Sequence, residues 1–310
     1  SNINSYAFQN CASLVELTIP NTILRMGESL FAGCANLKKL TIPFVGACRG
    51  NTDSWDAVFA YMFADSTFEG GERIQQYYGG YSYNYRYAYI PTNLTTVVLS
   101  DETCLGRGAF SGCLRLSTVT LNTGLKSIGA YAFSGCVNLD EIKMPEGVTA
   151  LGDYAFNDCS SMGVVGVAST VESWGSRVFS GCTNITFVVI PPGVKEIGSG
   201  AFAGCCHLKN VQIADSVKLI GSYAFQNCIA LEELKIPNGV LSMGESLFAG
   251  CANLKKLSIP FVGSRRGNVD SWDAVFAYMF ADAAEIVKDL SKIQAALWPE
   301  EQYAALNGML

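Results

Sequence analysis

The residues with the most chemical potential in this 310-residue chain are its twelve cysteines and its single histidine, His207. Cysteines at suitable spacing form disulfides, hold metal ions or act as nucleophiles. Nine of them recur at intervals of 23 residues within two runs, namely Cys11, Cys34, Cys113, Cys136, Cys159, Cys182, Cys205, Cys228 and Cys251. This spacing lacks the C-x-x-C pairs of zinc sites. We therefore expect no metal or cofactor, and we interpret the nine as buried thiols.

The remaining chemistry-bearing residues give no catalytic constellation. A Ser/His/Asp or Cys/His site would have to use His207, which lies in "GCCHLKN", where polar residues are expected at a turn. No glycine-rich phosphate loop follows a strand pattern. Cys48, Cys104 and Cys206 fall outside the 23-residue series. Free thiols are the favoured interpretation for them, with a Cys48–Cys104 disulfide open as the alternative in an oxidising environment, and no enzyme is expected.

Composition excludes two classes of partner. The formal net charge is -6 and no run of Lys or Arg is present, so we expect no nucleic-acid binding. No apolar stretch approaches the ~20 residues of a membrane helix, so no membrane insertion is expected. The N-terminus lacks the pattern of a signal peptide. Because "SNINSYAF" lies inside a repeating unit, this lack says little about export.

A 23-residue repeat surrounds the cysteines. One unit reads "AFSGCVNLDEIKMPEGVTALGDY", and each of the nine cysteines has a Phe three residues before it. The alternating "LDEIKMP" segment predicts a strand with one buried face, which the proline ends. V-x-x-I-G then predicts a short extended return and a glycine turn. A-F-x-x-C suits a short helical or 3-10 turn that places Phe and Cys inside.

Such a unit cannot bury its apolar side alone, so the units must stack. The pattern predicts an α/β solenoid with one parallel sheet and short helical or 3-10 turns. With strands ~4.8 Å apart, about eleven coils would span on the order of 50 Å. The repeat resembles the BspA-like leucine-rich repeat over residues 3–65 and 90–282. That resemblance implies a right-handed leucine-rich-repeat coil and a cell-surface or secreted protein, some relatives being adhesins that bind host or microbial proteins or glycans.

A second level of repetition indicates modular assembly. Residues 27–46 recur at 244–263 with one change, and "SWDAVFAYMFAD" recurs unaltered at 54–65 and 271–282. We expect Ser54 to cap a helix in this block. We assign residues 1–282 to the solenoid, with an insertion at about 66–89. Residues 283–310 are interpreted as a C-terminal helical cap, with a linker or a dimer helix as alternatives.

The outward positions of the predicted strands form mostly polar rows across the coils. Val164, Phe187 and Val189 are the exceptions, and they fall on adjacent coils. An exposed apolar patch needs a reason. We hypothesise a ligand or self-association site, against the alternatives of random drift or cover by a neighbouring loop.

The insertion carries "QQYYGGYSYNYRYAYIP", residues 75–91. Its alternation places five tyrosines on one face of an extended segment, namely Tyr81, Tyr83, Tyr85, Tyr87 and Tyr89, and the first four are candidate ligand contacts. The structural interpretation is a strand laid against the solenoid with its hydroxyls toward water. The functional interpretation is an aromatic platform for a glycan or host protein.

Two functions follow as expectations. The first is a non-enzymatic, extracellular adhesin or binding scaffold engaged in host interaction. The second is a structural spacer with no ligand of its own, which the interchangeable duplicated blocks favour.

Overall fold

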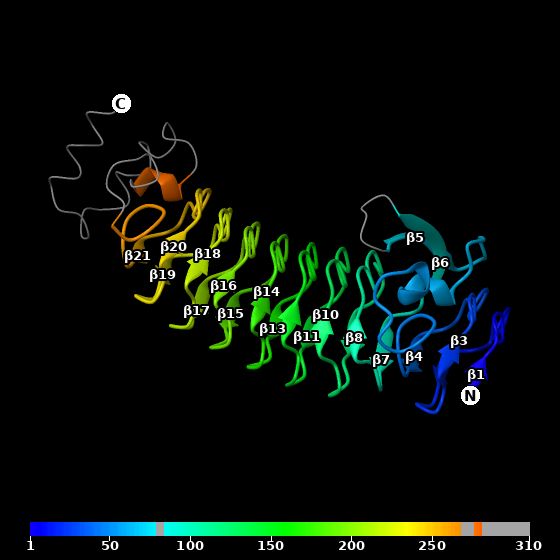
Figure 1. Cartoon of the computed structure of the whole chain (residues 1–310). Helices are drawn as coiled ribbons and strands as arrows, with labels where there is room; N and C mark the ends of the chain where they lie inside the picture. Colours follow the sequence, from blue (N-terminus) through cyan, green and yellow to red (C-terminus); the bar gives the residue numbers. More distant parts are fainter. Residues whose placement is uncertain (79–83, 268–275, 281–310) are drawn as a thin grey trace.

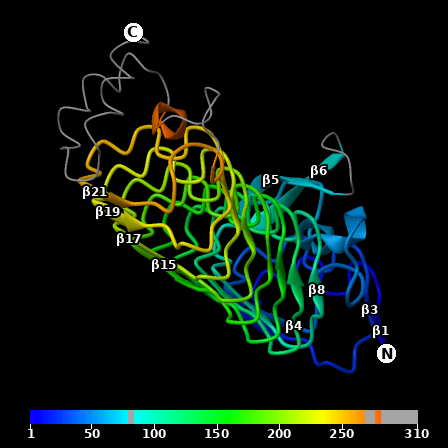
Figure 2. The ribbon, with the colours of Figure 1, turned by 60° about the vertical axis from the view of Figure 1, so that its left-hand side comes forward.

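The computed structural model describes residues 1–78, 84–267 and 276–280. The chain forms an elongated row of roughly eleven stacked coils (Figure 1). Consecutive coils pair through parallel strands along two sides of the row. After a turn of 60° about the vertical axis, the coils are seen one behind another (Figure 2), and their buried side chains form one core cluster.

The first ladder is built by the alternating segment after each Cys. Its strands are β2 (Glu16–Thr18), β4 (Lys39–Ile42), β7 (Thr96–Leu99), β9 (Thr118–Thr120), β11 (Glu141–Lys143), β13 (Val164–Gly166), β15 (Phe187–Ile190), β17 (Asn210–Ile213), β19 (Glu233–Lys235) and β21 (Lys256–Ser258). Six of them form one sheet in the order β13-β11-β9-β7-β4-β2, and the pairs β15-β17 and β19-β21 continue it. The register pairs Glu141 with Val164 and Phe187 with Asn210, as the 23-residue period predicts.

The second ladder is built by V-x-x-I-G. Its two-residue strands are β1 (Asn2–Ile3), β3 (Arg25–Met26), β8 (Cys104–Leu105), β10 (Ser127–Ile128), β12 (Ala150–Leu151), β14 (Ser173–Trp174), β16 (Glu196–Ile197), β18 (Leu219–Ile220) and β20 (Ser242–Met243). They pair as β1-β3, β14-β12-β10-β8 and β16-β18-β20. The prediction of one parallel sheet was therefore wrong, because the return segment also pairs with its neighbours.

The A-F-x-x-C segments are tight turns and not helices. In each, the Cys amide donates to the carbonyl of the Phe three residues earlier, as from Cys136 to Phe133 at 3.0 Å. Within the described residues the only helices are three short 3-10 segments, η1 (Trp55–Ala57), η2 (Phe59–Met62) and η4 (Phe276–Met279). The expected capped helix after Ser54 was wrong, since the chain turns extended at Val58 and Ser54 makes no side-chain cap.

The core is a column of phenylalanines edged by thiols. Rings of neighbouring coils stack nearly parallel, with centroids 5.2 Å apart for Phe133 and Phe156. Seven of the nine cysteines donate their S–H to the Phe carbonyl 26 residues earlier, as from Cys159 Sγ to Phe133 O at 3.1 Å. The thiol is a second donor to a carbonyl that also accepts the Cys amide of its own turn. The exceptions are Cys11, which is exposed in the first coil, and Cys113, whose Sγ lies 3.5 Å from Gln76 Nε2.

The insertion is an antiparallel hairpin of β5 (Gly71–Tyr77) and β6 (Tyr85–Pro91) laid against the turn edge of the solenoid (Figure 1). Its inner face buries Ile74, Ala88 and Ile90. The predicted strand of the insertion is confirmed over β6. The helical cap predicted for residues 283–310 lies outside the described residues, as do Tyr81 and Tyr83.

Candidate ligand-binding surface

The apolar patch on the first ladder consists of Val164 on β13 and of Phe187 and Val189 on β15. These side chains are 60%, 44% and 44% exposed. The outward positions one coil earlier hold Glu141 and Lys143, which form an ion pair at 3.7 Å. Other exposed apolar side chains, such as Leu24 and Leu241, lie in separate coils. The patch is therefore an apolar interruption of a polar sheet face.

A bulky residue lies in the second ladder of the coil that carries Val164. Trp174 occupies the V-x-x-I-G position that other coils fill with Ile, Leu or Met, and it is 5% exposed. Its ring lies 5.6 Å from that of Phe179 and 5.9 Å from that of Phe202. These two phenylalanines stand 6.0 Å apart, which is also the spacing of Phe225 and Phe248, so the indole does not widen the aromatic column beyond its spacing elsewhere. The Trp174 Nε1 is buried and has no hydrogen-bond partner within the described residues.

Both ladders are interrupted between the coil that contains Trp174 and the coil that follows it, which we call the Trp174 boundary. One coil earlier, Gly163, Glu172 and Gly175 donate backbone hydrogen bonds to the preceding coil at 3.0, 2.9 and 2.9 Å. Their equivalents are Thr186, Lys195 and Gly198, and no such bond forms from them within the described residues. β13 and β15 consequently belong to separate sheets, as do β14 and β16.

The third side of the coil stays closed at the same boundary. Phe179 N–H donates to Ala201 O at 2.9 Å, and Gly181 N–H donates to Ala203 O at 2.8 Å. The two coils are therefore held along the turn edge and separated along both ladders. The patch of Val164, Phe187 and Val189 lies where the first ladder opens.

The hairpin presents a second exposed cluster. Tyr85 and Tyr87 are exposed on β6, and Tyr77 of β5 joins them. The ring centroids of Tyr77 and Tyr85 are 5.8 Å apart, and those of Tyr85 and Tyr87 are 5.5 Å apart. The Arg73 guanidinium lies 4.6 Å from the Tyr87 ring centroid. The hairpin and the strands β15 to β21 lie on different sides of the solenoid (Figure 2), so the two clusters are separate surfaces.

Sequence reasoning missed a row of side chains on the turn edge: Arg107, Tyr131, Tyr154 and Arg177. Tyr131 and Tyr154 stack at 4.7 Å with an interplanar angle of 5°. Tyrosine also stands two residues before the Phe at Tyr6 and Tyr223. That recurrence two residues before the Phe of the repeat was the available signal, since one residue per coil at a fixed position forms a row.

The buried cysteines of the repeat have low chemical reactivity. Burial raises the pKa of Cys34 to about 11 and that of Cys136 to about 12. A buried thiol that stays protonated is a poor nucleophile and a poor metal ligand. All twelve cysteines are free, Cys48 and Cys104 included. Within the described residues no group of His, Cys, Asp and Glu has the arrangement of a metal site.

The single histidine is bound to the backbone at the surface. His207 is exposed, and its Nδ1 lies 2.7 Å from Thr183 O. This contact bridges two successive coils. His207 therefore acts as a polar turn residue, as its sequence context predicts.

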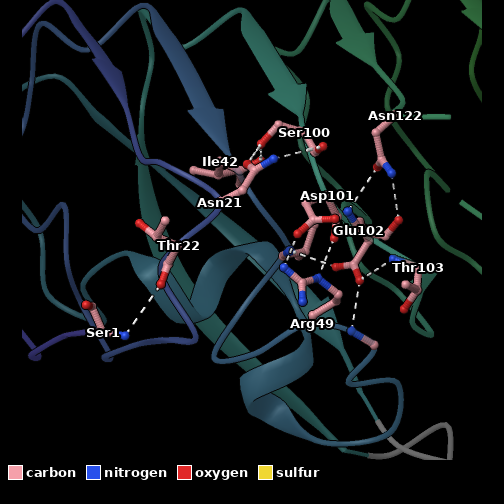
Figure 3. A network of polar contacts seen from close by, with 12 residues as sticks. Ser1, Asn21, Thr22, Ile42, Arg49, Ser100, Asp101, Glu102, Thr103 and Asn122 are labelled. Atoms are coloured by element: carbon pink, nitrogen blue, oxygen red, sulfur yellow. Dashed lines mark hydrogen bonds and ion pairs between the residues drawn. The ribbon is translucent and has the colours of Figure 1, made fainter. Parts of the chain in front are cut away.

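One buried carboxylate ties the loop after β4 to the segment before β8 (Figure 3). Glu102 is 1% exposed and accepts backbone hydrogen bonds from Val45 at 3.0 Å, Gly50 at 2.8 Å and Thr103 at 2.9 Å. Burial raises the pKa of this carboxyl, and the backbone amides oppose the rise. Every donor that surrounds it belongs to the fold, so Glu102 is structural.

A scan of protein families matches the BspA type leucine rich repeat region in 6 copies, over residues 1–48, 83–205 and 173–268. The chain belongs to this family. Leucine-rich repeat solenoids typically serve as protein-binding scaffolds and not as enzymes. Within the described residues no helix has the length and apolar character needed to cross a bilayer.

Of three solved structures that are similar to the chain, one has a TM-score above 0.5 and supports this fold. A leucine-rich repeat protein from Eubacterium ventriosum is 19% identical with a TM-score of 0.51, over 88% of this chain and 84% of that one. One from Bacteroides ovatus is 22% identical with a TM-score of 0.42, over 84% and 76%. A leucine rich cell surface protein from Faecalibacterium prausnitzii is 20% identical with a TM-score of 0.40, over 96% and 87%. The search of curated proteins found no match.

Proposed function

We propose that this chain is a surface-exposed or secreted binding scaffold of the adhesin type, which engages a host or microbial protein or glycan. The observation that carries the proposal is the apolar patch of Val164, Phe187 and Val189. Exposed apolar residues on an otherwise polar sheet face favour an interaction site. Phe and Val also lose little side-chain entropy when a partner covers them.

The location outside the cell is part of the same proposal. Its support is the family, whose members are largely surface or secreted proteins according to the resemblance above. The buried cysteines of the repeat are compatible with an oxidising extracellular environment, because buried protonated thiols resist oxidation.

The test uses purified matrix proteins, mucin and a glycan array against the whole chain. The double variant F187S/V189S should lose most of the binding found for the parent chain, while its thermal transition stays nearly unchanged because both side chains are exposed. N210S/Q212S is the matched control, since Asn210 and Gln212 pair with Phe187 and Val189 in the next coil. Equal binding curves for both variants and the parent would contradict the proposal.

Self-association at the patch is a separate outcome. Sedimentation of the parent chain over a range of concentrations would show it as a dimer that F187S/V189S converts to monomer. The partner would then be a second copy of the chain.

The alternative is a structural spacer. The duplicated block supports it, because both copies use the same backbone contact: Ser29 N–H donates to Tyr61 O at 2.9 Å, and Ser246 N–H donates to Tyr278 O at 2.8 Å. Equivalent, interchangeable blocks suit a protein whose length is its function. A chain that binds none of the probes, with or without the patch, would favour the spacer.

A further inference from the structure

The turn edge of the solenoid carries a row of cationic and phenolic groups, which we call the Arg–Tyr strip: Arg107, Tyr131, Tyr154 and Arg177. The Arg107 Cζ lies 4.6 Å from the Tyr131 centroid, and the Arg177 Cζ lies 6.0 Å from the Tyr154 centroid. With the two rings stacked at 4.7 Å, the order along the row is guanidinium, phenol, phenol, guanidinium. The four groups come from successive coils and are half-buried.

The strip residues sit in the left-handed turn of the repeat. Tyr131, Tyr154 and Arg177 have φ angles of 58°, 58° and 53°. Tyr6, Ser29, Tyr223 and Ser246 hold the same position in other coils with φ between 50° and 62°, so this conformation belongs to the repeat and not to the strip alone. Gly108 and Gly200 occupy the same position in the flanking coils, with φ of 66° and 62°. A glycine would therefore fit all three positions without strain, and the side chains are retained at a conformational cost.

The charges of the strip have no partner. Neither Arg107 nor Arg177 forms an ion pair with a carboxylate of the described residues. The Arg107 Nε is buried and has no acceptor. The neighbouring Asp153 accepts a hydrogen bond from Ser176 N–H at 2.7 Å instead. In a chain of net charge -6, the strip is thus a local cationic site with unused donors.

The geometry decides what the strip can recognise. The Tyr131 ring has Tyr154 on one face and the Arg107 guanidinium at 4.6 Å on the other. The Arg177 guanidinium is farther from Tyr154, at 6.0 Å, and its side chain lies next to Gly200 of the following coil. Ring edges, hydroxyls and the outer N–H groups of the guanidinium planes remain for a ligand. Stacked arginines still donate in their plane, which suits bidentate contacts with carboxylates. Preformed stacking also lowers the entropic cost of binding.

The strip continues toward the tyrosine cluster of the hairpin. A Cβ placed on Gly108, the residue after Arg107, would lie 2.3 Å from the carbonyl oxygen of Tyr77. Tyr77 ends β5 and stacks with Tyr85. Tyrosine and arginine are the residues most enriched among energetic centres of protein interfaces. The turn edge therefore offers one track of Tyr and Arg across the hairpin and three further coils.

We infer, on the basis of the proposed protein-binding role, that the Arg–Tyr strip binds an extended acidic segment of a partner protein. Carboxylates of the segment pair with Arg107 and Arg177, and the Tyr131 and Tyr154 hydroxyls donate to groups between them. This surface is distinct from the patch of Val164, Phe187 and Val189.

The probe is a fluorescein-labelled oligoglutamate peptide, titrated with the whole chain and followed by fluorescence anisotropy. The parent chain should bind it more tightly than oligoglutamine, and added salt should weaken the binding. R107Q/R177Q should lower the affinity by about tenfold or more, the loss expected for charge-assisted hydrogen bonds. Y131F/Y154F should lower it by about threefold, because only the hydroxyls are lost.

Two matched controls separate the strip from general effects. Arg25→Gln removes one exposed positive charge elsewhere and should leave the affinity unchanged. Tyr223→Gly removes a tyrosine with φ 62° whose hydroxyl bonds Glu245 at 3.0 Å, and it should also leave the affinity unchanged. Y131G/Y154G relieves the backbone and must keep the circular dichroism of the parent while it loses the peptide.

Three results would overturn the inference: equal affinity for oligoglutamate and oligoglutamine, parental affinity in R107Q/R177Q, or an equal loss in Arg25→Gln. Binding of a sulfated or uronate polysaccharide that R107Q/R177Q abolishes, with no oligoglutamate binding, would also overturn it in favour of a glycan. The matrix-protein experiment tests the patch of Val164, Phe187 and Val189 with a different variant. A negative result for the Arg–Tyr strip therefore does not contradict the proposed function of the patch, and the reverse is also true.

Discussion

Strand pairing between coils is interrupted at the insertion, after Trp174 and, in the first ladder alone, between β17 and β19. The first two regions satisfy their backbone in opposite ways. At the insertion, β3 and β8 are not paired, yet side chains replace the missing contacts: Glu102 accepts from Val45 and Gly50, and the buried Gln76 accepts from Ala60 N–H at 2.7 Å. At the Trp174 boundary, three backbone amides and the indole N–H have no partner within the described residues.

The difference shows that an irregular coil need not be a weak one. The aromatic column also continues through the insertion, because Phe59 lies 5.1 Å from Phe63 and 5.0 Å from Phe110. Stability in a stacked array depends on each neighbour contact. We therefore expect the insertion to be rigid and the Trp174 boundary to be the place where the array opens most readily.

The largest effect is expected when the closure of the insertion is removed. Gln76 is fully buried, and its Nε2 donates to Ser111 O at 2.8 Å. Gln76→Ala leaves Ala60 N–H and Ser111 O buried without partners, which should cost about 2 to 4 kcal/mol of unfolding free energy. Chemical denaturation of the parent and of Gln76→Ala measures this loss of unfolding free energy. Gln75→Ala, on the other face of the same strand, should cost well under half as much, and equal losses would mean that Gln76 does not seal the insertion.

A second prediction concerns local opening at the Trp174 boundary. The amides of Thr186, Lys195 and Gly198 should have hydrogen-exchange protection factors about tenfold or more below those of Gly163, Glu172 and Gly175. The second set holds the same positions one coil earlier and forms the missing bonds. Equal protection in the two sets would erase the contrast between the boundary and its neighbours.

A further variant tests whether Trp174 causes this local opening. Trp174→Leu installs the residue type of the other coils and should raise the protection of Lys195 and Gly198. The stability should change by less than about 1 kcal/mol, because the lost ring contacts are offset by removal of a buried unpaired donor. Unchanged protection in this variant would mean that the indole is not what separates the coils.

The sequence predicts the regular part of this contrast well and the irregular part poorly. The 23-residue period predicts the stack, the Phe column and the register of the outward rows. It missed the second ladder because strands of two residues are too short to show alternation. It also predicted a helix after Ser54, since a stripe of apolar residues there fits two 3-10 turns as well as one helix.

The candidate sites divide in the same way. Val164, Phe187 and Val189 follow from the rows, because each coil adds one residue at a known position. The break of both ladders next to these residues depends on how one coil stacks on the next, and the sequence of a single repeat does not reveal it. The Arg–Tyr strip depends on side chains from different repeat positions, as Arg107 precedes the position that Tyr131 fills. Such contacts exist only after stacking.

The smallest expected effect is the pH dependence of the stability that Glu102 contributes through Val45, Gly50 and Thr103. Burial raises the folded pKa of Glu102 above its ordinary 4.5, so the folded protein holds this proton more tightly than the unfolded chain. The stability that Glu102 contributes is then fully present below 4.5 and is lost as pH rises through the folded pKa. The unfolding free energy of the parent minus that of Glu102→Gln should therefore grow as the pH is lowered from neutral to about 4. Taking this difference cancels the titration of the other carboxylates. A difference that shrinks on acidification would mean that the amides of Val45, Gly50 and Thr103 stabilise the charge more than burial disfavours it, and the loop after β4 would then be held by an ionic contact.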